Sequence, residues 1–405
     1  MRKFLTFGLF ALLISCLSET GVEPGSSTTF IRYFNGGNND EAQDLAVAED
    51  GGFVILATTR IQKAESDTLR TKIKLIKTDK AGNPLWQHLY PDFSIKNLNY
   101  SAAAIQLVPN GGGYIIAGGV IDGSGISKSL VMLVDENGVL QNSLDLELNA
   151  GVNEKGKGVA INSIGNFLAL SSQGTSNMII TEIDKTTFLP ITSVGHSSGD
   201  TEIDTRLVVD ETDKAVWSGV VTNSGLQGVR LTKTIPANTN TEFDQLLGNP
   251  GFNEVGNDFC KYGLIYVITG STNQKPGSAT AGADTDILFK RVDGDGAILS
   301  TASFPIEGQN DIGNSINTTL DGGLILLASA NSAGIGGRGD TDFYLIKING
   351  FGDQEWTSAF GSKFKDEGVT ALQSTDGGYI ILGTTTQGSI KIVTLIKTNE
   401  KGKIE

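Results

Sequence analysis

One apolar phrase recurs seven times along this chain of 405 residues, and this repetition limits the possible folds more than any other feature. The first copy reads DGGFVILATT (50–59) and the last reads DGGYIILGTT (376–385). The apolar cores of the copies begin 48 to 61 residues apart, at Phe53, Tyr114, Phe167, Ala215, Tyr266, Leu324 and Tyr379. A period of about fifty residues with several short strands in each period is typical of the blades of a β-propeller.

Each repeat unit has the same internal order of strands and turns, which we name A to D. In the first unit, strand A (AQDLAVA, 42–48) leads through a Gly-rich turn into the apolar phrase, strand B. A variable loop precedes strand C (IKLIKTD, 73–79), and a tight turn leads to strand D (PLWQHLY, 84–90). Strand B is almost continuously apolar, as expected for a strand that is buried on both faces. We therefore predict an all-β protein of seven four-stranded antiparallel blades.

The fifth position of the phrase is occupied by Ala, Gly or Ser in every copy. These residues are Ala57, Gly118, Ser171, Gly219, Gly270, Ala328 and Gly383. We interpret this restriction as steric, because a large side chain would collide near the narrow axis where blades converge.

The two ends of the chain complement each other. The seventh unit ends in VTLIKTNEKGKIE (393–405) and contains strands A to C but no strand D. Near the start of the chain, FIRYFNGGNNDEAQDL (30–45) matches WTSAFGSKFKDEGVTAL (356–372), which spans a strand D and the next strand A. We predict that the N-terminal strand completes the last blade and closes the ring, which removes the sheet edges that an open ring would expose.

These residues resemble the bacterial β-propeller repeats often called SBBP-like, with the pattern D-G-G-[YF]-[IV]-[IL]-x-[GA]-x-T followed by K-x-[DN]-x-x-G-x-x-x-W. The match is strong in blades 1, 6 and 7, fair in blades 2 and 5, and weak in blades 3 and 4. Such repeats are common in secreted and cell-surface proteins, notably of Bacteroidota. The resemblance implies the propeller fold and implies no single activity.

The N-terminal segment has the features of a secretion signal. Arg2 and Lys3 precede an apolar run (4–14) that is too short to span a bilayer. The run ends in Leu-Ile-Ser-Cys (13–16), which resembles the lipobox of bacterial lipoproteins. The resemblance implies cleavage before Cys16 and attachment of lipid to it; an ordinary signal peptide with an unrelated Cys is the alternative.

This interpretation divides the chain into a signal peptide (1–15), a lipidated Cys16 with a flexible tether (16–27) and the propeller (28–405). Leu17 rather than Asp after the cysteine favours the outer membrane, on either its periplasmic or its cell-surface side. The net charge of −14 becomes −16 when the two cations of the signal peptide are removed. Such a surface repels nucleic acid and anionic headgroups, so membrane attachment is expected through Cys16 alone.

Functional residues are expected on the face formed by the B–C and D–A loops, where the units differ most. Candidate binding loops lie in blades 1 (60–72), 5 (271–286) and 6 (330–342). An acid also recurs where the chain enters strand A, in all units except the second: Asp40, Glu154, Glu202, Glu254, Asp311 and Asp366. If these side chains point inward, they form an acidic channel mouth that could bind a cation or a basic peptide. The alternative is that each acid caps its own strand entry.

Two of the B–C loops end in the same Asp-Thr-Asp sequence. The carboxylates concerned are Asp284 and Asp286 in blade 5 and Asp340 and Asp342 in blade 6. Paired carboxylates at this spacing can hold Ca²⁺, the one cofactor the sequence suggests. The same residues also suit the capping of a loop through nearby backbone N–H groups.

The sequence offers little material for catalysis. His88 and His196 are its only histidines, and the lone Cys260 is expected to be a buried thiol. Trp86 and Trp356 occupy equivalent positions on strand D, and the loops contain almost no aromatic residues that could stack on a sugar. We predict a non-enzymatic outer-membrane lipoprotein that binds other envelope proteins as a scaffold or accessory subunit. The alternative is a polysaccharide-binding or polysaccharide-cleaving surface lipoprotein.

Overall fold

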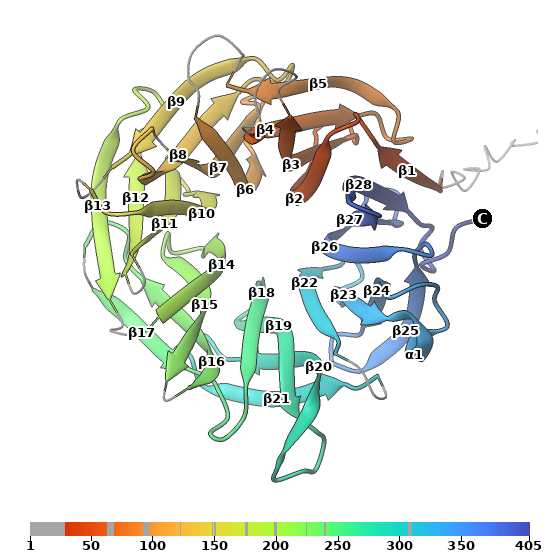
Figure 1. Ribbon diagram of the computed structural model, residues 1–405. Coiled ribbons are helices and arrows are strands. Elements are labelled where there is room, and N and C mark those ends of the chain that lie inside the picture. Colours follow the sequence, from red (N-terminus) through yellow and green to blue (C-terminus); the bar gives the residue numbers. More distant parts are fainter. Residues whose placement is uncertain are drawn as a thin grey trace, which may run out of the picture.

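The computed structural model describes residues 29–62, 69–91, 98–121, 123–147, 149, 151–174, 177–197, 201–223, 225–238, 240–306 and 310–405. Within these residues the chain forms seven four-stranded antiparallel sheets, arranged as the blades of a ring (Figure 1). The predicted all-β, seven-bladed propeller is therefore confirmed. The described ranges contain one helix, the single turn α1 (Ser332–Ile335), and no helix long and apolar enough to cross a membrane.

In each blade strand A lies nearest the centre of the ring and strand D lies at its outer rim (Figure 1). In the order A to D, the blades are β2 (Asn39–Val47), β3 (Phe53–Gln62), β4 (Leu69–Thr78) and β5 (Pro84–Tyr90); β6 (Asn99–Leu107), β7 (Tyr114–Ile121), β8 (Ser127–Val134) and β9 (Leu140–Leu146); β10 (Glu154–Ile161), β11 (Phe167–Gln173), β12 (Asn177–Ile183) and β13 (Pro190–Ser197); β14 (Thr201–Val209), β15 (Ala215–Asn223), β16 (Leu226–Thr234) and β17 (Thr241–Leu246); β18 (Glu254–Tyr262), β19 (Ile265–Gln274), β20 (Ala281–Val292) and β21 (Ile298–Phe304); β22 (Ile312–Thr318), β23 (Leu324–Asn331), β24 (Thr341–Ile348) and β25 (Gln354–Phe360); and β26 (Lys365–Gln373), β27 (Tyr379–Gln387), β28 (Ile390–Lys397) and β1 (Phe30–Phe34).

The ring is closed by the N-terminal strand, as the sequence predicts. β1 pairs antiparallel with β28 along its whole length, as strand D of blade 7. Beyond the strand, Thr29 Oγ1 donates a hydrogen bond to the carbonyl oxygen of Glu405 at 2.8 Å. A shared core then joins the first blade to the last, with Phe53 and Ile380 in one buried cluster.

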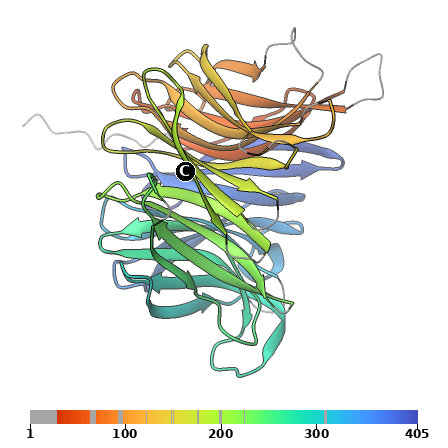
Figure 2. The same ribbon diagram turned by 90° about the vertical axis from the view of Figure 1, so that its left-hand side faces the viewer.

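The strand register gives the ring two different faces. Asn39, at the start of strand A, lies opposite Arg60 near the end of strand B, whereas Val47 lies opposite Phe53 at the A–B turn. The B–C and D–A loops therefore share one face, here named the loop face, and the A–B and C–D turns share the other, the turn face. Figure 2 shows the ring from its edge, with the two faces on opposite sides.

A β-bulge interrupts strand A at the same place in every blade. In blade 5 the bulge follows Gly256, which lies opposite the small fifth residue of strand B, Gly270. A Cβ on Gly270 would overlap the carbonyl oxygen of Val255, and a Cβ on Gly383 of blade 7 would overlap the ring of Phe343. The small residue is thus required sterically, as predicted, but by its own strand A and the preceding blade rather than by crowding at the axis.

The residues that repeat best along the chain form ion pairs within the blades. The Asp of the D-G-G turn binds the Lys near the end of strand C in three blades: Asp50 with Lys77 (2.6 Å), Asp321 with Lys347 (3.0 Å) and Asp376 with Lys397. The three lysine side chains are at most 5% exposed. These pairs fasten the A–B turn to strand C, so the repeated motif belongs to the scaffold.

Candidate functional site

Those acids at the entry of strand A whose side chains the structure describes are not exposed on the channel surface. Five of them are at most 1% exposed: Asp40, Glu154, Glu254, Asp311 and Asp366. The sixth, Glu202, lies in β14, and its side chain is outside the described residues. The five described carboxylates are therefore buried within the protein.

Each of these carboxylates is held by groups close to its own strand entry. Asp40 accepts a hydrogen bond from Lys74 Nζ at 2.6 Å, and Glu254 accepts one from Lys290 Nζ at 2.8 Å. Asp366 accepts the backbone N–H of Ser362 at 2.6 Å. Glu154 and Asp311 bind Gln173 Nε2 (2.7 Å) and the backbone N–H of Asn331 (2.9 Å), respectively. These contacts fit the strand-capping role that the sequence left open as the alternative.

The paired carboxylates of the B–C loops lie in two blades and form no joint site. In blade 5 the ammonium of Lys275 lies 2.6 Å from Asp286 and 3.1 Å from Asp284, and so supplies the positive charge that a cation would bring. In blade 6, Asp342 is buried and accepts the backbone N–H of Arg338 at 2.6 Å, whereas Asp340 is exposed. Across the described ranges, no group of three or more His, Cys, Asp or Glu side chains could hold a metal ion.

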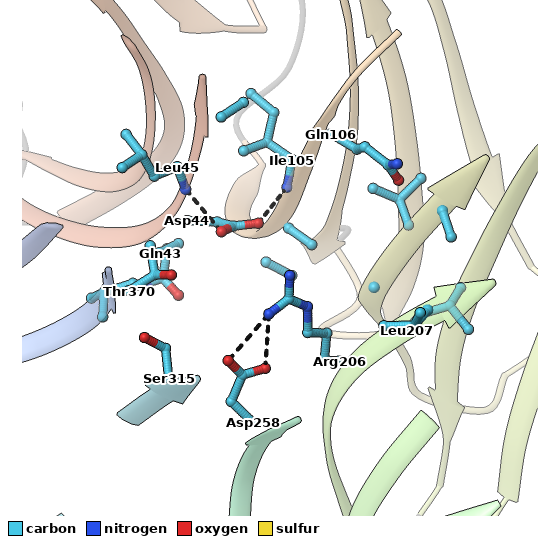
Figure 3. Close-up of a pocket in the computed structure, with 18 of the residues that line it drawn as sticks. Gln43, Asp44, Leu45, Ile105, Gln106, Arg206, Leu207, Asp258, Ser315 and Thr370 are labelled. Carbon is cyan, nitrogen blue, oxygen red and sulfur yellow. Dashed lines mark hydrogen bonds and ion pairs between the residues drawn. The ribbon is translucent and has the colours of Figure 1, made fainter. Parts of the chain in front are cut away.

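The central channel contains a polar cluster that sequence reasoning missed. The residue after the bulge of each strand A lines one cavity of about 500 Å³ (Figure 3). These residues are Asp44, Ala104, Gly158, Arg206, Asp258, Ser315 and Thr370. A bulge re-aims the side chains beside it, and here it directs a side chain into the channel from every blade except the third, where the residue is Gly158.

Arg206 lies at the centre of this cluster, between Asp44 and Asp258 (Figure 3). Its Nη1 lies 3.2 Å from both carboxylate oxygens of Asp258 and 3.2 Å from Oδ1 of Asn317. Asp258 also accepts the backbone N–H of Ile316 at 2.9 Å. The Arg206 side chain keeps 38% of its surface exposed, so it stays accessible to a ligand in the channel.

Asp44 is the second carboxylate of the channel cluster. It accepts the backbone N–H groups of Leu45 at 2.8 Å and Ile105 at 2.9 Å. Burial raises the pKa of Asp44 to about 6, against the lowering effect of these two hydrogen bonds and the charge of Arg206. Burial likewise raises the pKa of Asp258, although the charge of Arg206 opposes the shift. Asp44 is therefore a carboxyl group that titrates close to neutral pH.

The rest of the cavity wall consists of small, aliphatic and amide side chains together with one charged residue, Lys157. The described lining includes Gln43, Gln106, Asn257 and Asn314, and it contains no aromatic, His or Cys residue. This chemistry suits hydrogen bonding to a polar group and offers no ring on which a sugar could stack. The residue type after the bulge differs from blade to blade, and a bulge has no sequence signature here, so the strand pattern did not reveal the cluster.

The remaining candidate residues have structural surroundings. Cys260 is buried, and burial raises the pKa of its thiol to about 12. The rings of His88 and Trp86 lie beside each other in a tilted arrangement, with centroids 5.1 Å apart. His196 lies in β13, with its ring centroid 5.2 Å from that of Trp217. Cys16 lies outside the described residues, so its lipidation remains a prediction.

No family model and no curated protein sequence matches this chain. Solved structures match it along most of its length. They include a protein of unknown function from Dyadobacter fermentans DSM 18053 (9% identity, TM-score 0.54, 91% of this chain and 97% of that one), a chain from the mitotic checkpoint complex (11%, 0.56, 98% and 99%) and the polysaccharide lyase Uly1 (9%, 0.54, 89% and 90%). Similarity at this level shows the propeller fold, which hosts many unrelated activities.

Proposed function

We propose that the protein is a non-enzymatic binding module of the cell envelope, anchored by a lipid on Cys16, that holds a protein partner on its loop face. The charged residues that recur from blade to blade form ion pairs and hydrogen bonds within the propeller itself. The loops after strand B are where the blades differ, and variable loops on a rigid frame commonly carry recognition.

The hairpin between β19 and β20 carries this proposal, because it is an ordered projection of the loop face. Figure 1 shows it extending beyond the ring. β20 is 12 residues long, and its pairing with β19 continues as far as Gln274 opposite Ala281. The ion pairs of Lys275 with Asp284 and Asp286 stabilise the base of the hairpin. A segment that is already ordered loses less conformational entropy when it binds a partner.

The test is co-purification of the protein from its own membranes in mild detergent. We expect a partner to accompany the full chain and to fall at least tenfold in yield when Pro276–Thr280 is replaced by Asn-Gly. A matched substitution on the turn face, Glu400→Gln, should leave the yield unchanged. Recovery of the full chain without any partner, or equal recovery of partner with both variants, would contradict the proposal.

The lipid anchor has a separate test. Replacing Cys16 by Ala should move the protein from the membrane fraction to the soluble fraction, because the lipobox-like sequence supplies the only predicted attachment. Membrane retention of the Cys16→Ala protein would contradict lipidation at this residue.

The channel cluster favours one further candidate, binding or cleavage of a polysaccharide. Asp44, with its pKa of about 6, could donate a proton near neutral pH, and Asp258 lies in the same cavity. One solved structure of similar fold is a polysaccharide lyase. Assay of the full chain against neutral and anionic polysaccharides decides the matter: cleavage that is lost in Asp44→Asn would replace the scaffold proposal. If neither the parent protein nor Asp44→Asn cleaves any of the polysaccharides, a polysaccharide-cleaving function is eliminated.

A further inference from the structure

Exposed apolar side chains are distributed unevenly between the two faces of the ring. In the described part of the chain, the five most exposed large apolar residues are Phe351 (85%), Leu264 (82%), Leu320 (77%), Ile164 (62%) and Leu189 (60%). All five lie in A–B or C–D turns, and hence on the turn face. Single exposed apolar side chains are normal, but their gathering on one face marks a surface for interaction.

The three most exposed of these residues form one patch across blades 5 and 6. We name Leu264, Leu320 and Phe351 the turn-face patch. One hydrogen bond joins the turns of Leu264 and Leu320, because Tyr262 Oη donates to the carbonyl oxygen of Gly322 at 2.5 Å. The turn of Phe351 is joined to strand β20 of blade 5, where Arg291 Nη1 donates to the carbonyl oxygen of Phe351 at 3.0 Å. Hydrogen bonds therefore fix all three turns across the interface between blades 5 and 6.

The N-terminal strand enters the ring from the same face. β1 is a strand D, which runs from the turn face to the loop face. At its beginning, Thr29 binds Glu405 beyond the last C–D turn, and Arg32 Nη2 donates to the carbonyl oxygen of Ala81 in the C–D turn of blade 1 at 3.4 Å. The twelve residues of 17–28 span at most about 40 Å when fully extended. A lipid on Cys16 would thus hold the turn face near the bilayer.

We propose that the turn-face patch rests on the lipid surface in which Cys16 is anchored, so that the loop face points away from the membrane. This inference depends on the lipid anchor of the proposed function. Apolar side chains gain free energy when they enter the interfacial region of a bilayer, and stable attachment generally needs a second contact besides an acyl chain. The contact is apolar rather than electrostatic, because the chain has a net charge of −14 and Asp321 beside Leu320 is paired with Lys347.

The orientation can be measured with the full-length lipidated protein in vesicles of phosphatidylethanolamine and phosphatidylcholine that contain a lipid-borne quencher. A fluorophore is attached to a cysteine introduced by Phe351→Cys on the turn face or by Ser278→Cys on the loop face; the buried Cys260 does not compete for the label. We expect the lipid-borne quencher to quench the Phe351→Cys probe several-fold more than the Ser278→Cys probe. Equal or reversed quenching would overturn the proposal. The Phe351→Cys probe could also be shielded from an aqueous quencher without being quenched by the lipid-borne one. This result would indicate that another protein covers the turn-face patch, and it would overturn the proposal too.

A second set of variants tests the patch itself. Leu264→Asp with Leu320→Asp should reduce quenching of the Phe351→Cys probe, whereas Leu246→Asp, a leucine 53% exposed on the loop face, should not. Unchanged melting temperatures would show that the fold is intact. Equal quenching in all these proteins would contradict a role for the patch. If only the proposed orientation is wrong, the protein stays bound to the vesicles. If the lipid anchor of the proposed function is absent, the protein is released from them, so failure of the orientation and failure of the anchor are distinguishable.

Discussion

The recurring acid at the entry of strand A is one sequence position with several local environments. Lysines on strand C neutralise Asp40 and Glu254, whereas Asp366 is held by hydroxyl and backbone donors. Asp311 accepts a single described hydrogen bond, and its Oδ2 has no described partner. An acid at this position therefore contributes differently to stability from blade to blade, which substitutions of Glu254, Asp311 and Asp366 can show.

Removing one partner of the buried pair in blade 5 should be costly. In Glu254→Ala, the ammonium of Lys290, 1% exposed, would lose the carboxylate 2.8 Å away. We expect a loss of about 3–5 kcal/mol in the free energy of unfolding, measured by urea denaturation. The matched control is Glu367→Ala, whose partner Lys365 is 49% exposed, and it should cost less than about 1 kcal/mol. Equal costs for the two variants would refute the interpretation.

Asp311 should make stability depend on pH. Burial, followed by the charge of Asp286, raises its pKa from the ordinary value of 3.8 to about 6. The folded state then binds a proton more tightly than the unfolded chain, so this contribution to stability is full below about pH 4 and is lost as pH rises through about 6. Asp311→Asn keeps an acceptor for the N–H of Asn331 and removes the charge. We expect it to be more stable than the parent above pH 6, with a smaller difference near pH 4, in urea denaturation across this range.

A carboxylate with a full set of donors provides the control. Oδ2 of Asp366 accepts a hydrogen bond from the Ser362 N–H and Oδ1 accepts one from the Thr385 hydroxyl. An amide nitrogen in place of either oxygen could not accept the bond made to that oxygen. Asp366→Asn should therefore be destabilising at neutral pH. A gain in stability from Asp366→Asn, or none from Asp311→Asn, would contradict this account of the two positions.

At the scale of single strands, the bulge in strand A is the decisive element. It brings strand A over strand B so closely that strand B needs a small residue opposite. In every blade except the third, which has Gly158 there, it also turns one side chain into the channel. Asp44, Arg206 and Asp258 meet only because their bulges occur at the same level of the ring. The bulge thus explains both the small fifth residue of strand B and the existence of the channel cluster.

Gly270 provides a direct test of this close approach. A Cβ at this position would overlap the carbonyl oxygen of Val255, so Gly270→Ala should cost about 1–3 kcal/mol in urea denaturation. Gly195 lies on the outer strand β13 with nothing within 4 Å of an added Cβ, and Gly195→Ala should change stability by no more than about 0.5 kcal/mol. If Gly270→Ala leaves the free energy of unfolding unchanged, strand A can move away from strand B with little loss of stability.

At the scale of the whole molecule, stability depends on closure of the ring. β1 covers the edge of β28, and the core formed by blades 1 and 7 includes Phe30 from β1. Without β1 the last sheet would have three strands and an open edge, and part of this core would face solvent.

Two truncations isolate the contribution of closure. Removal of residues 1–28 leaves β1 in place and should not change the melting temperature of the propeller. Removal of residues 1–34 also deletes β1, and we expect the melting temperature in calorimetry to fall by about 5–10 °C, as several kcal/mol of stability are lost. Equal melting temperatures for the two truncations would disprove the role of the N-terminal strand.

Much of this architecture was predictable from the repeat, because each unit encodes a similar local structure. The position of Phe53 and its six counterparts indicates the number of blades, and the match of 30–45 with 356–372 indicates how the ring closes. The acidic series was visible too, but its burial was not. A pattern of residue types does not show whether the lysine that neutralises Asp40 approaches from strand C or whether the carboxylate stays open to the channel.

By itself, therefore, the sequence determined the seven blades, their strand order and the closing strand, since these follow from local patterns repeated along the chain. Only the tertiary structure decided which side chains meet. Asp44, Arg206 and Asp258 come from blades 1, 4 and 5, and they come together because the bulges of separate strands point into one channel. The tertiary structure likewise brought the chain's entry into the ring and the apolar turn tips to one face, because the register within each blade sets which loops and turns lie together.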